Sequence, residues 1–305
     1  MEKLIINKLP TRTWNRLGVN EAAIEWNAAD TAKLPGESIS LSAAEKKTAH
    51  IAVRAESEYA EKTVTLTVAP GGELTVYEDI AAADKLAVRT DITLGENAKL
   101  RLVQVQSAAE GGIARSAITA DCADGAGVEL VQILLGAGDV YTDCLTELRG
   151  DASTFKADVG YIARGTQKID VNLVCNHYGK HTESEIAANG ALMDSSEKIF
   201  RGTIDFKTGS SDSVGNEKET VLMLGENVVN KTVPLILCAE ENVVGNHGAT
   251  IGELDADTLF YFESRGISRA EAENILARSA VERLARTVGD AAVEERIMTM
   301  LNEEL

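Results

Sequence analysis

The segment Thr63–Val68, with the sequence TVTLTV, alternates polar and apolar residues and is typical of the chain from about Ala49 to Ile251. Successive side chains of a strand point to opposite faces, so this period of two predicts β-strands with one buried face. Clusters rich in Gly, Asn and Asp separate these short runs and indicate turns. The central region is therefore predicted to be β structure rather than helix.

The turn clusters recur at long intervals. Gly72 to Gly95 and Gly127 to Gly150 both span 23 positions, whereas Gly95 to Gly125 spans 30. A repeat near 23 residues is what one coil of a β-solenoid would give, because each coil lays its strands in register on the previous coil. An antiparallel sandwich, with turns roughly every 8–12 residues, stays open because shorter turn signals also occur.

The last fifty residues have a helical pattern. The segment from residue 254 to Gly266 predicts a short helix with Asp255 as N-cap and Gly266 at its stop. A capping box from Ser268 to Glu271 starts a second helix, and a third segment runs to the C-terminus. The predicted domains are an N-terminal segment (1–48), a β-helix core (49–252) and a C-terminal helical region (253–305).

Two apolar stripes run along these C-terminal helices. The first stripe is expected to pack on the chain's own domain, as amphipathic helices normally do. The second would be free to dock on a partner if the solenoid behind it is already capped. The first stripe comprises Ala277, Val281, Leu284 and Val288, and the second Val293, Ile297, Met300 and Leu301.

Composition narrows the class of protein. The chain has 305 residues and a net charge of −18, which disfavours nucleic acid and anionic membranes as partners. The first residues lack a secretory cleavage site, and no apolar run approaches the roughly 20 residues of a membrane span. Four cysteines without CxxC spacing indicate neither a disulfide framework nor a zinc knuckle. A cytoplasmic protein with reduced thiols is expected.

Four blocks of sequence carry a resemblance to a known family. The stretch from Val233 to Gly252, continued from Leu259 to Ile267, closely resembles the signature of the SufB/SufD family of iron–sulfur cluster assembly scaffolds. Upstream, residues 177–184 and 198–204 look like two further family blocks in the expected order. The resemblance covers roughly residues 170–270.

This resemblance implies both a fold and a set of partners. The implied fold is a right-handed parallel β-helix followed by a C-terminal α-helical region. The implied role is a non-enzymatic scaffold of the SUF system that pairs with a SufB-like subunit and docks a SufC-like ATPase through its C-terminal helices. A homodimer stays open as an alternative to the pairing with SufB. The chain contains no GxxxxGK[ST] phosphate loop, so nucleotide hydrolysis must come from another chain.

His247 is the main candidate ligand. SufB-type members resemble the pattern His-Glu-Ala-Thr where this chain has His247-Gly248-Ala249-Thr250, and the missing carboxylate favours a SufD-like member. SufD-type members often carry a cysteine two residues before the histidine, but Gly245 stands there. Iron and its clusters bind thiolate or imidazole. We therefore expect a transient iron–sulfur cluster or iron, shared with a partner subunit at the interface.

Four other cysteine and histidine residues are potential donors. Cys238 lies in an apolar strand and is expected to be a buried inert thiol, with a contribution to the shared interface site as the alternative. Cys175 and His177 would share one face of a strand, but His181 lies beyond a glycine turn. A closed tetrahedral zinc site is therefore not expected there.

An enzyme remains the competing class, because a β-helix with clustered acids could be a polysaccharide lyase or hydrolase. The acids stand where helix caps and strand ends give them ordinary structural roles. Aromatic residues, which carbohydrate sites use as platforms, make up only 4% of the chain. A purely structural β-solenoid is a third possibility. The acid pairs in question are Asp255/Asp257, Glu240/Glu241 and Glu294/Glu295.

Overall fold

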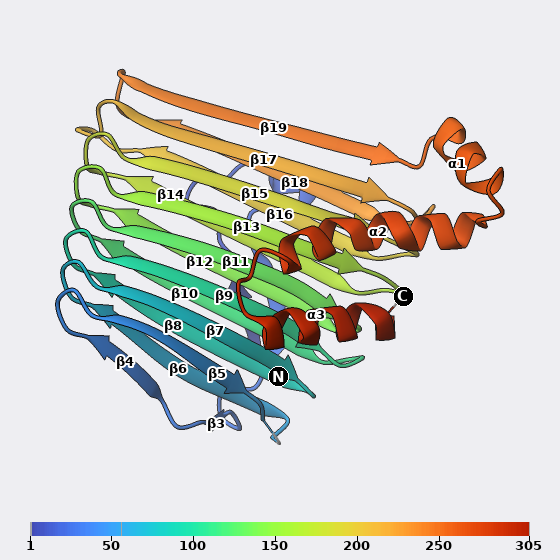
Figure 1. Cartoon of the computed structure of the whole chain (residues 1–305), viewed down its shortest axis with the longest axis horizontal. Helices are drawn as coiled ribbons and strands as arrows, with labels where there is room; N and C mark the ends of the chain where they lie inside the picture. The colour runs from blue at the N-terminus through green and yellow to red at the C-terminus, as the bar shows by residue number, and fades with distance from the viewer. Residues whose placement is uncertain (1, 56, 305) are drawn as a thin grey trace.

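The computed structural model describes residues 2–55 and 57–304, and two long sheets that lie face to face dominate it (Figure 1). In this part of the chain the first sheet contains β3 (Ala32–Lys33), β4 (Glu37–Leu41), β6 (Tyr59–Val68), β8 (Lys85–Leu94), β10 (Ile113–Cys122), β12 (Asp139–Leu148), β14 (Lys168–His177), β16 (Glu197–Phe206) and β18 (Val229–Cys238). The second contains β5 (Lys46–Val53), β7 (Glu73–Ala82), β9 (Lys99–Ala108), β11 (Gly127–Gly136), β13 (Thr154–Ala163), β15 (Glu183–Leu192), β17 (Ser213–Met223) and β19 (Val243–Glu253).

From β4 onward consecutive strands alternate between the two sheets, and the pairings within both sheets are parallel. This is a parallel β-solenoid, which confirms the predicted β-helix over the sandwich. One coil takes 26 residues from Glu73 to its partner Lys99 and 32 from Glu197 to Val229. The predicted repeat near 23 was therefore wrong. The interval of 23 joins glycines at different positions of successive turns, because Gly72 ends one turn whereas Gly95 begins the next.

One corner of the solenoid repeats a left-handed backbone residue. Gly71, Asn97, Gly125, Ala152 and His181 have φ between 55° and 69°. Each donates its N–H to a carbonyl of the next coil, as Gly71 does to Glu96 (2.8 Å) and His181 to Ser211 (3.0 Å). Glycine and asparagine adopt this conformation most readily, which explains the turn clusters.

The N-terminal segment lies across the outer face of the first sheet. Strands β1 (Glu2–Ile6) and β2 (Ala22–Trp26) form an antiparallel hairpin, and a short 3-10 turn, η1 (Asn15–Leu17), lies between them. A buried ion pair between Asp170 and Arg201 holds this segment. Asn7 donates to Asp170 Oδ1 (2.6 Å), and Arg201 Nε donates to the carbonyl of Val19 (2.5 Å). The strands of the two sheets start at Ala32, before residue 49, where the sequence predicts the core to begin.

Three helices follow β19, namely α1 (Ala256–Glu263), α2 (Arg269–Ala285) and α3 (Ala291–Glu304). The N-cap at Asp255 and the capping box from Ser268 to Glu271 form as predicted. None of the described helices has the length and apolar character needed to cross a membrane.

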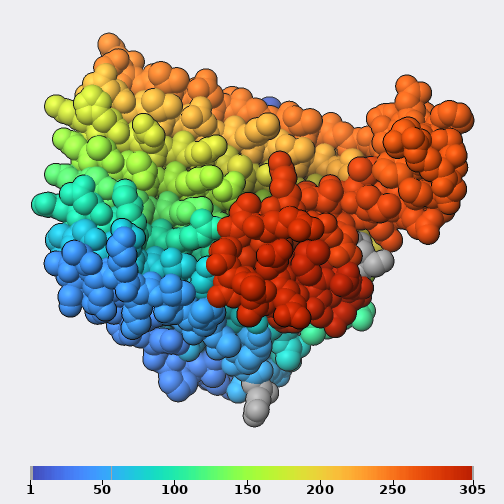
Figure 2. Space-filling view, in the orientation of Figure 1, coloured from blue at the N-terminus to red at the C-terminus, as the bar shows by residue number. Residues whose placement is uncertain are grey.

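Helices α2 and α3 cover the outer face of the second sheet, whose strands β9 and β11 carry outward-pointing apolar side chains such as Val103 and Ile133 (Figures 1 and 2). Ile297 and Leu301 of α3 are fully buried there, and Tyr77 donates to the carbonyl of Val288 (3.0 Å). The stripe of the last helix therefore packs on its own solenoid. The expectation that it stays free for a partner was wrong, because the sheet face beneath it is itself apolar.

Removal of Arg201 is predicted to destabilise the fold strongly. Arg201→Ala leaves the buried Asp170 carboxylate without its cation, so the free energy of unfolding should fall by about 3–5 kcal/mol. Urea unfolding followed by circular dichroism measures this change. Lys46→Ala breaks a solvent-exposed pair with Glu73 and should change stability by at most about 1 kcal/mol. Equal effects of the two substitutions would contradict the role assigned to the buried pair.

Candidate functional site

His247 lies in the middle of β19, the last strand of the second sheet, where no further coil of the described chain stacks on it (Figure 1). Its register partner on β17 is Glu217, which is only 5% exposed. Parallel partners share a face of the sheet, so His247 belongs to the set of side chains that points into the solenoid interior. It is nevertheless exposed, because the interior is open at this end. We call this open end, bounded by β18 and β19, the mouth.

Charged side chains lie inside the solenoid directly below the mouth. Lys198 of β16 forms a buried ion pair with Glu219 of β17, and Thr232 of β18 donates to the second oxygen of Glu219 (2.5 Å). Desolvation raises the pKa of Glu217 to about 8, with a smaller contribution from the nearby charge of Glu219. The mouth therefore places an accessible imidazole above a group of buried ionisable side chains.

These buried residues were not predicted from the sequence. In β17, SVGNEKETVLM, neither alternate face is uniformly apolar, so Glu217 and Glu219 look like residues of a solvent-facing side. The signal that could have found them is the phase of the alternation. Glu219 stands two residues and Glu217 four residues before the buried Val221, so all three side chains point to the same face of the strand.

Cys238 is exposed, not buried as the sequence predicted, because it stands at the end of β18 beside the mouth. Its register partner is the fully buried Phe206. The structure does not join Cys238 to His247. The corner after β18 leads to Val243, and His247 lies four residues, or about 13 Å, further along β19.

Cys175 and His177 share the interior face of β14 as predicted, with 3.7 Å between Sγ and Nε2. The ring of His177 is fully buried and bonds Thr182 Oγ1 through Nδ1 (2.7 Å) and Ser184 Oγ through Nε2 (2.9 Å). Desolvation lowers its pKa to about 4. His181 occupies the left-handed corner position described above. Within residues 2–55 and 57–304 no three His, Cys, Asp or Glu side chains are grouped as a metal site.

A second polar group lies deep in the N-terminal half of the solenoid. Gln104 Nε2 donates to Glu78 (2.5 Å), and Gln132 Nε2 donates to Gln104 Oε1 (2.8 Å) and Thr142 Oγ1 (2.7 Å). Desolvation raises the pKa of Glu78 to about 7. These side chains bond one another across adjacent coils. They stand among apolar interior residues of their strands, and the sequence pattern alone did not mark them as buried.

Acids that suggested a hydrolase have structural partners. Asp255 accepts from the N–H of Thr258 (2.8 Å) at the start of α1, and Glu240 accepts from the N–H of Gly209 (2.9 Å) in a neighbouring turn. Glu294 stands in the first turn of α3. Each carboxylate is used by a different element, so these pairs do not converge on one site.

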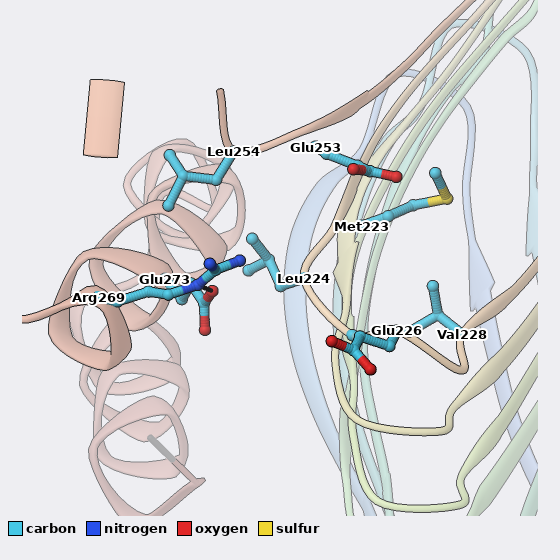
Figure 3. Close-up of a pocket in the computed structure, with 9 residues that line it drawn as sticks. Met223, Leu224, Glu226, Val228, Glu253, Leu254, Arg269 and Glu273 are labelled. Atoms are coloured by element: carbon cyan, nitrogen blue, oxygen red, sulfur yellow. Dashed lines mark hydrogen bonds and ion pairs between the residues drawn. The ribbon is translucent and has the colours of Figure 1, made fainter. Parts of the chain in front are cut away.

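A cleft of about 380 Å³ separates the solenoid from the helices at the C-terminal end. Figure 3 shows Arg269 and Glu273 of α2 on one side and Met223, Glu226 and Glu253 on the other. Helix α1 lies beyond this cleft and projects past the solenoid in Figure 2. The cleft thus marks where α1 separates from the rest of the molecule.

The fold defines a parallel β-solenoid whose last coil leaves His247 exposed at the mouth. Residues 50–280 match the family described as SUF system FeS cluster assembly, SufBD core domain. The chain therefore belongs to the SufB/SufD family, as the sequence blocks predicted, and is a SufD-like member.

Individual relatives are similar over limited lengths. The chain is 27% identical to the iron–sulfur cluster assembly protein SufD of Bacillus subtilis over 56% of its own length and 39% of the relative's. It is 22% identical to SufD of Escherichia coli over 79% and 58% of the two chains. A SufBD family protein of Mycobacterium tuberculosis matches at 22% over 77% and 61%. The chain thus spans less than two thirds of the length of each of these relatives.

Burial of a neutral His177 predicts a loss of stability in acid. Its pKa is about 4 in the folded chain and near 6.5 when unfolded, so only the unfolded state gains a proton between these values. Relative to His177→Gln, the native chain should lose up to about 3 kcal/mol of unfolding free energy as pH falls from 7 to 4. Urea unfolding of both chains across this range measures the difference, in which the other titrating groups cancel. A difference that stays constant with pH would contradict a buried neutral imidazole.

Proposed function

We propose that this chain is a SufD-like scaffold subunit of an iron–sulfur cluster assembly complex. In this proposal it pairs with a SufB-like subunit through the mouth, and a SufC-like ATPase docks on its C-terminal helices. An iron–sulfur cluster or iron is held transiently between the paired subunits. The observation that carries the proposal is an open solenoid end that presents His247 beside two unpaired strand edges.

The strand edges support pairing. Strands β18 and β19 end the two sheets, and among the strands that the structure describes each has one pairing partner, β16 and β17 respectively. Such an edge presents free N–H and C=O groups that another strand can satisfy. Val244 and Ile251 of β19 are also about half exposed, so apolar contact would accompany the hydrogen bonds. A solenoid of the same kind offers matching edges, which favours a sibling subunit and allows a second copy of this chain as the alternative partner.

The ligand set supports a shared site. His247 supplies one imidazole at the mouth, and the chain has no group of three metal-ligating side chains in its described residues. A cluster or iron ion at this place therefore needs donors from the companion chain, and thiolates are the donors that clusters prefer. Cys238 is also exposed beside the mouth, at the corner that lies about 13 Å along β19 from His247, so in the proposal it offers the shared interface a thiolate separate from the His247 ligand.

The exposed aromatic residues of α1 support docking of an ATPase. Phe260 is 71% exposed and Tyr261 54% exposed, and α1 has no buried residue. Exposed aromatic side chains are frequent anchors of protein interfaces, and the Tyr261 ring is held in place by the Arg265 guanidinium, 3.9 Å from its centroid. Because the α3 stripe is buried, the proposed docking surface lies on α1. The exposed Ile275 of the next helix, α2, is a further apolar residue.

Loss of His247 is predicted to lower cluster content without dissolving the complex. His247→Ala, co-expressed with a cysteine-bearing SufB-like sibling, should reduce the iron and sulfide that co-purify with the complex by at least about tenfold, because one ligand of the shared site is missing. Elemental analysis and size-exclusion chromatography measure the two properties. Asn246→Ala, which changes the neighbouring exposed residue, is the control. Unchanged cluster content in an intact complex would contradict the ligand role.

Loss of the α1 aromatic residues is predicted to weaken ATPase binding. Each buried anchor contributes about 2 kcal/mol or more, so Phe260→Ala should raise the dissociation constant roughly 30-fold, and Tyr261→Ala should add to this. Isothermal titration calorimetry with the purified ATPase gives the constants. Trp14→Ala removes an exposed aromatic residue of the N-terminal segment and should have no effect. Native affinity in the α1 double variant would place the docking surface elsewhere.

A further inference from the structure

Glu217 differs from the other buried ionisable side chains of this region because its oxygen Oε2 has no hydrogen-bonding partner. The buried Lys198 donates hydrogen bonds to Glu219 and Thr232. Both oxygens of Glu219 are bonded in turn, one by Lys198 and one by Thr232. Glu217 Oε2, in contrast, is buried and accepts no hydrogen bond. The ammonium group of Lys198 is thus used by Glu219, and Glu217 has no part in this ion pair.

Such a carboxylate is a burden on the fold. A buried carboxyl group without a hydrogen-bonding partner lowers the stability of a protein whether it is ionised or neutral, and an apolar side chain of the same size would avoid this cost. The interior leaves space for the group nonetheless. A Cβ atom added to Gly202, across the interior on β16, would come within 2.4–2.6 Å of the Glu217 carboxyl atoms. Glycine at this position lets the carboxylate occupy the interior below the mouth.

The place of Glu217 relative to His247 suggests what its unpaired oxygen binds. The two residues are direct register partners on β17 and β19, one strand spacing apart and on the same face. Any ion bound to the imidazole from inside the mouth would meet the carboxylate next. Oxygen and imidazole donors together suit divalent first-row metal ions such as ferrous iron.

We propose that Glu217 is a second ligand of the site at His247, and that the two side chains together hold a divalent iron ion at the mouth of the solenoid. The metal ion gives the Glu217 carboxyl group the partner that it lacks. The partner subunit completes the coordination. This inference rests on the proposed function. It adds that the species bound at this site is a single metal ion, which binds before a cluster is complete.

Binding of Co²⁺ alone to the full chain, followed by its visible absorption, tests this inference without a partner subunit. Co²⁺ replaces the oxygen-sensitive ferrous ion. The native chain should bind one Co²⁺, and Glu217→Gln and His247→Ala should each weaken binding by at least about tenfold. The double variant should bind little more weakly than either single variant, because both residues serve one ion. Glu253→Gln, an exposed carboxylate at the end of β19, is the matched control and should bind as the native chain does.

Thermal unfolding of the metal-free chains separates a ligand role from a structural one. Glu217→Gln keeps the shape of the side chain and replaces one unpaired buried polar group by another, so its melting temperature should stay close to that of the native chain. A lower melting temperature with native Co²⁺ affinity would show that Glu217 serves the fold and would overturn the inference.

Absence of saturable Co²⁺ binding by the native chain, or native affinity in Glu217→Gln, would also overturn the inference. The proposed function is tested separately by the cluster content of the co-expressed complex. A complex whose cluster depends on His247 but not on Glu217 would leave that function standing and remove only the carboxylate ligand.

Discussion

The ladder of backbone hydrogen bonds between successive coils is the interaction on which this molecule depends. Every coil satisfies the N–H and C=O groups of the coil below it, and the corner residues with left-handed backbone extend the ladder around the turn. A ladder of this kind has no internal reason to stop. Its last strands, β18 and β19, keep unpaired edges, and β19, whose residues are mostly exposed, carries the candidate ligand His247.

The same stacking decides where charge can stand inside the molecule. Register places residues of successive coils in columns, so a polar side chain is satisfied only by its neighbours in adjacent coils or across the interior. Glu78 meets Gln104 in this way, and Glu219 meets Lys198. Glu217 has His247 as its neighbour in the next coil, at the end of the column. A buried charge at the end of a ladder can be completed by what binds there, whereas one in the middle cannot.

Stacking also explains the division of labour among the helices. Outward-pointing Val103 and Ile133 make the second sheet apolar on its outer face, and α2 and α3 cover it. The apolar stripes of α2 and α3 are buried against the solenoid. The exposed apolar surface of the helical region is therefore on α1, at Phe260 and Tyr261. The cleft beside Arg269 separates this surface from the solenoid end.

The sequence alone determined the strand texture, the turn residues, the helix caps at Asp255 and Ser268, and the family, because each depends on neighbours within a few positions. It placed His247 at the site by motif. Only the tertiary structure decided that the coil takes 26–32 residues, that Cys238 is exposed and that the α3 stripe is buried. Glu217 became visible in the same way. These features depend on which residues lie opposite one another after some thirty intervening positions, and local pattern carries no information about a register set by the stacking of whole coils.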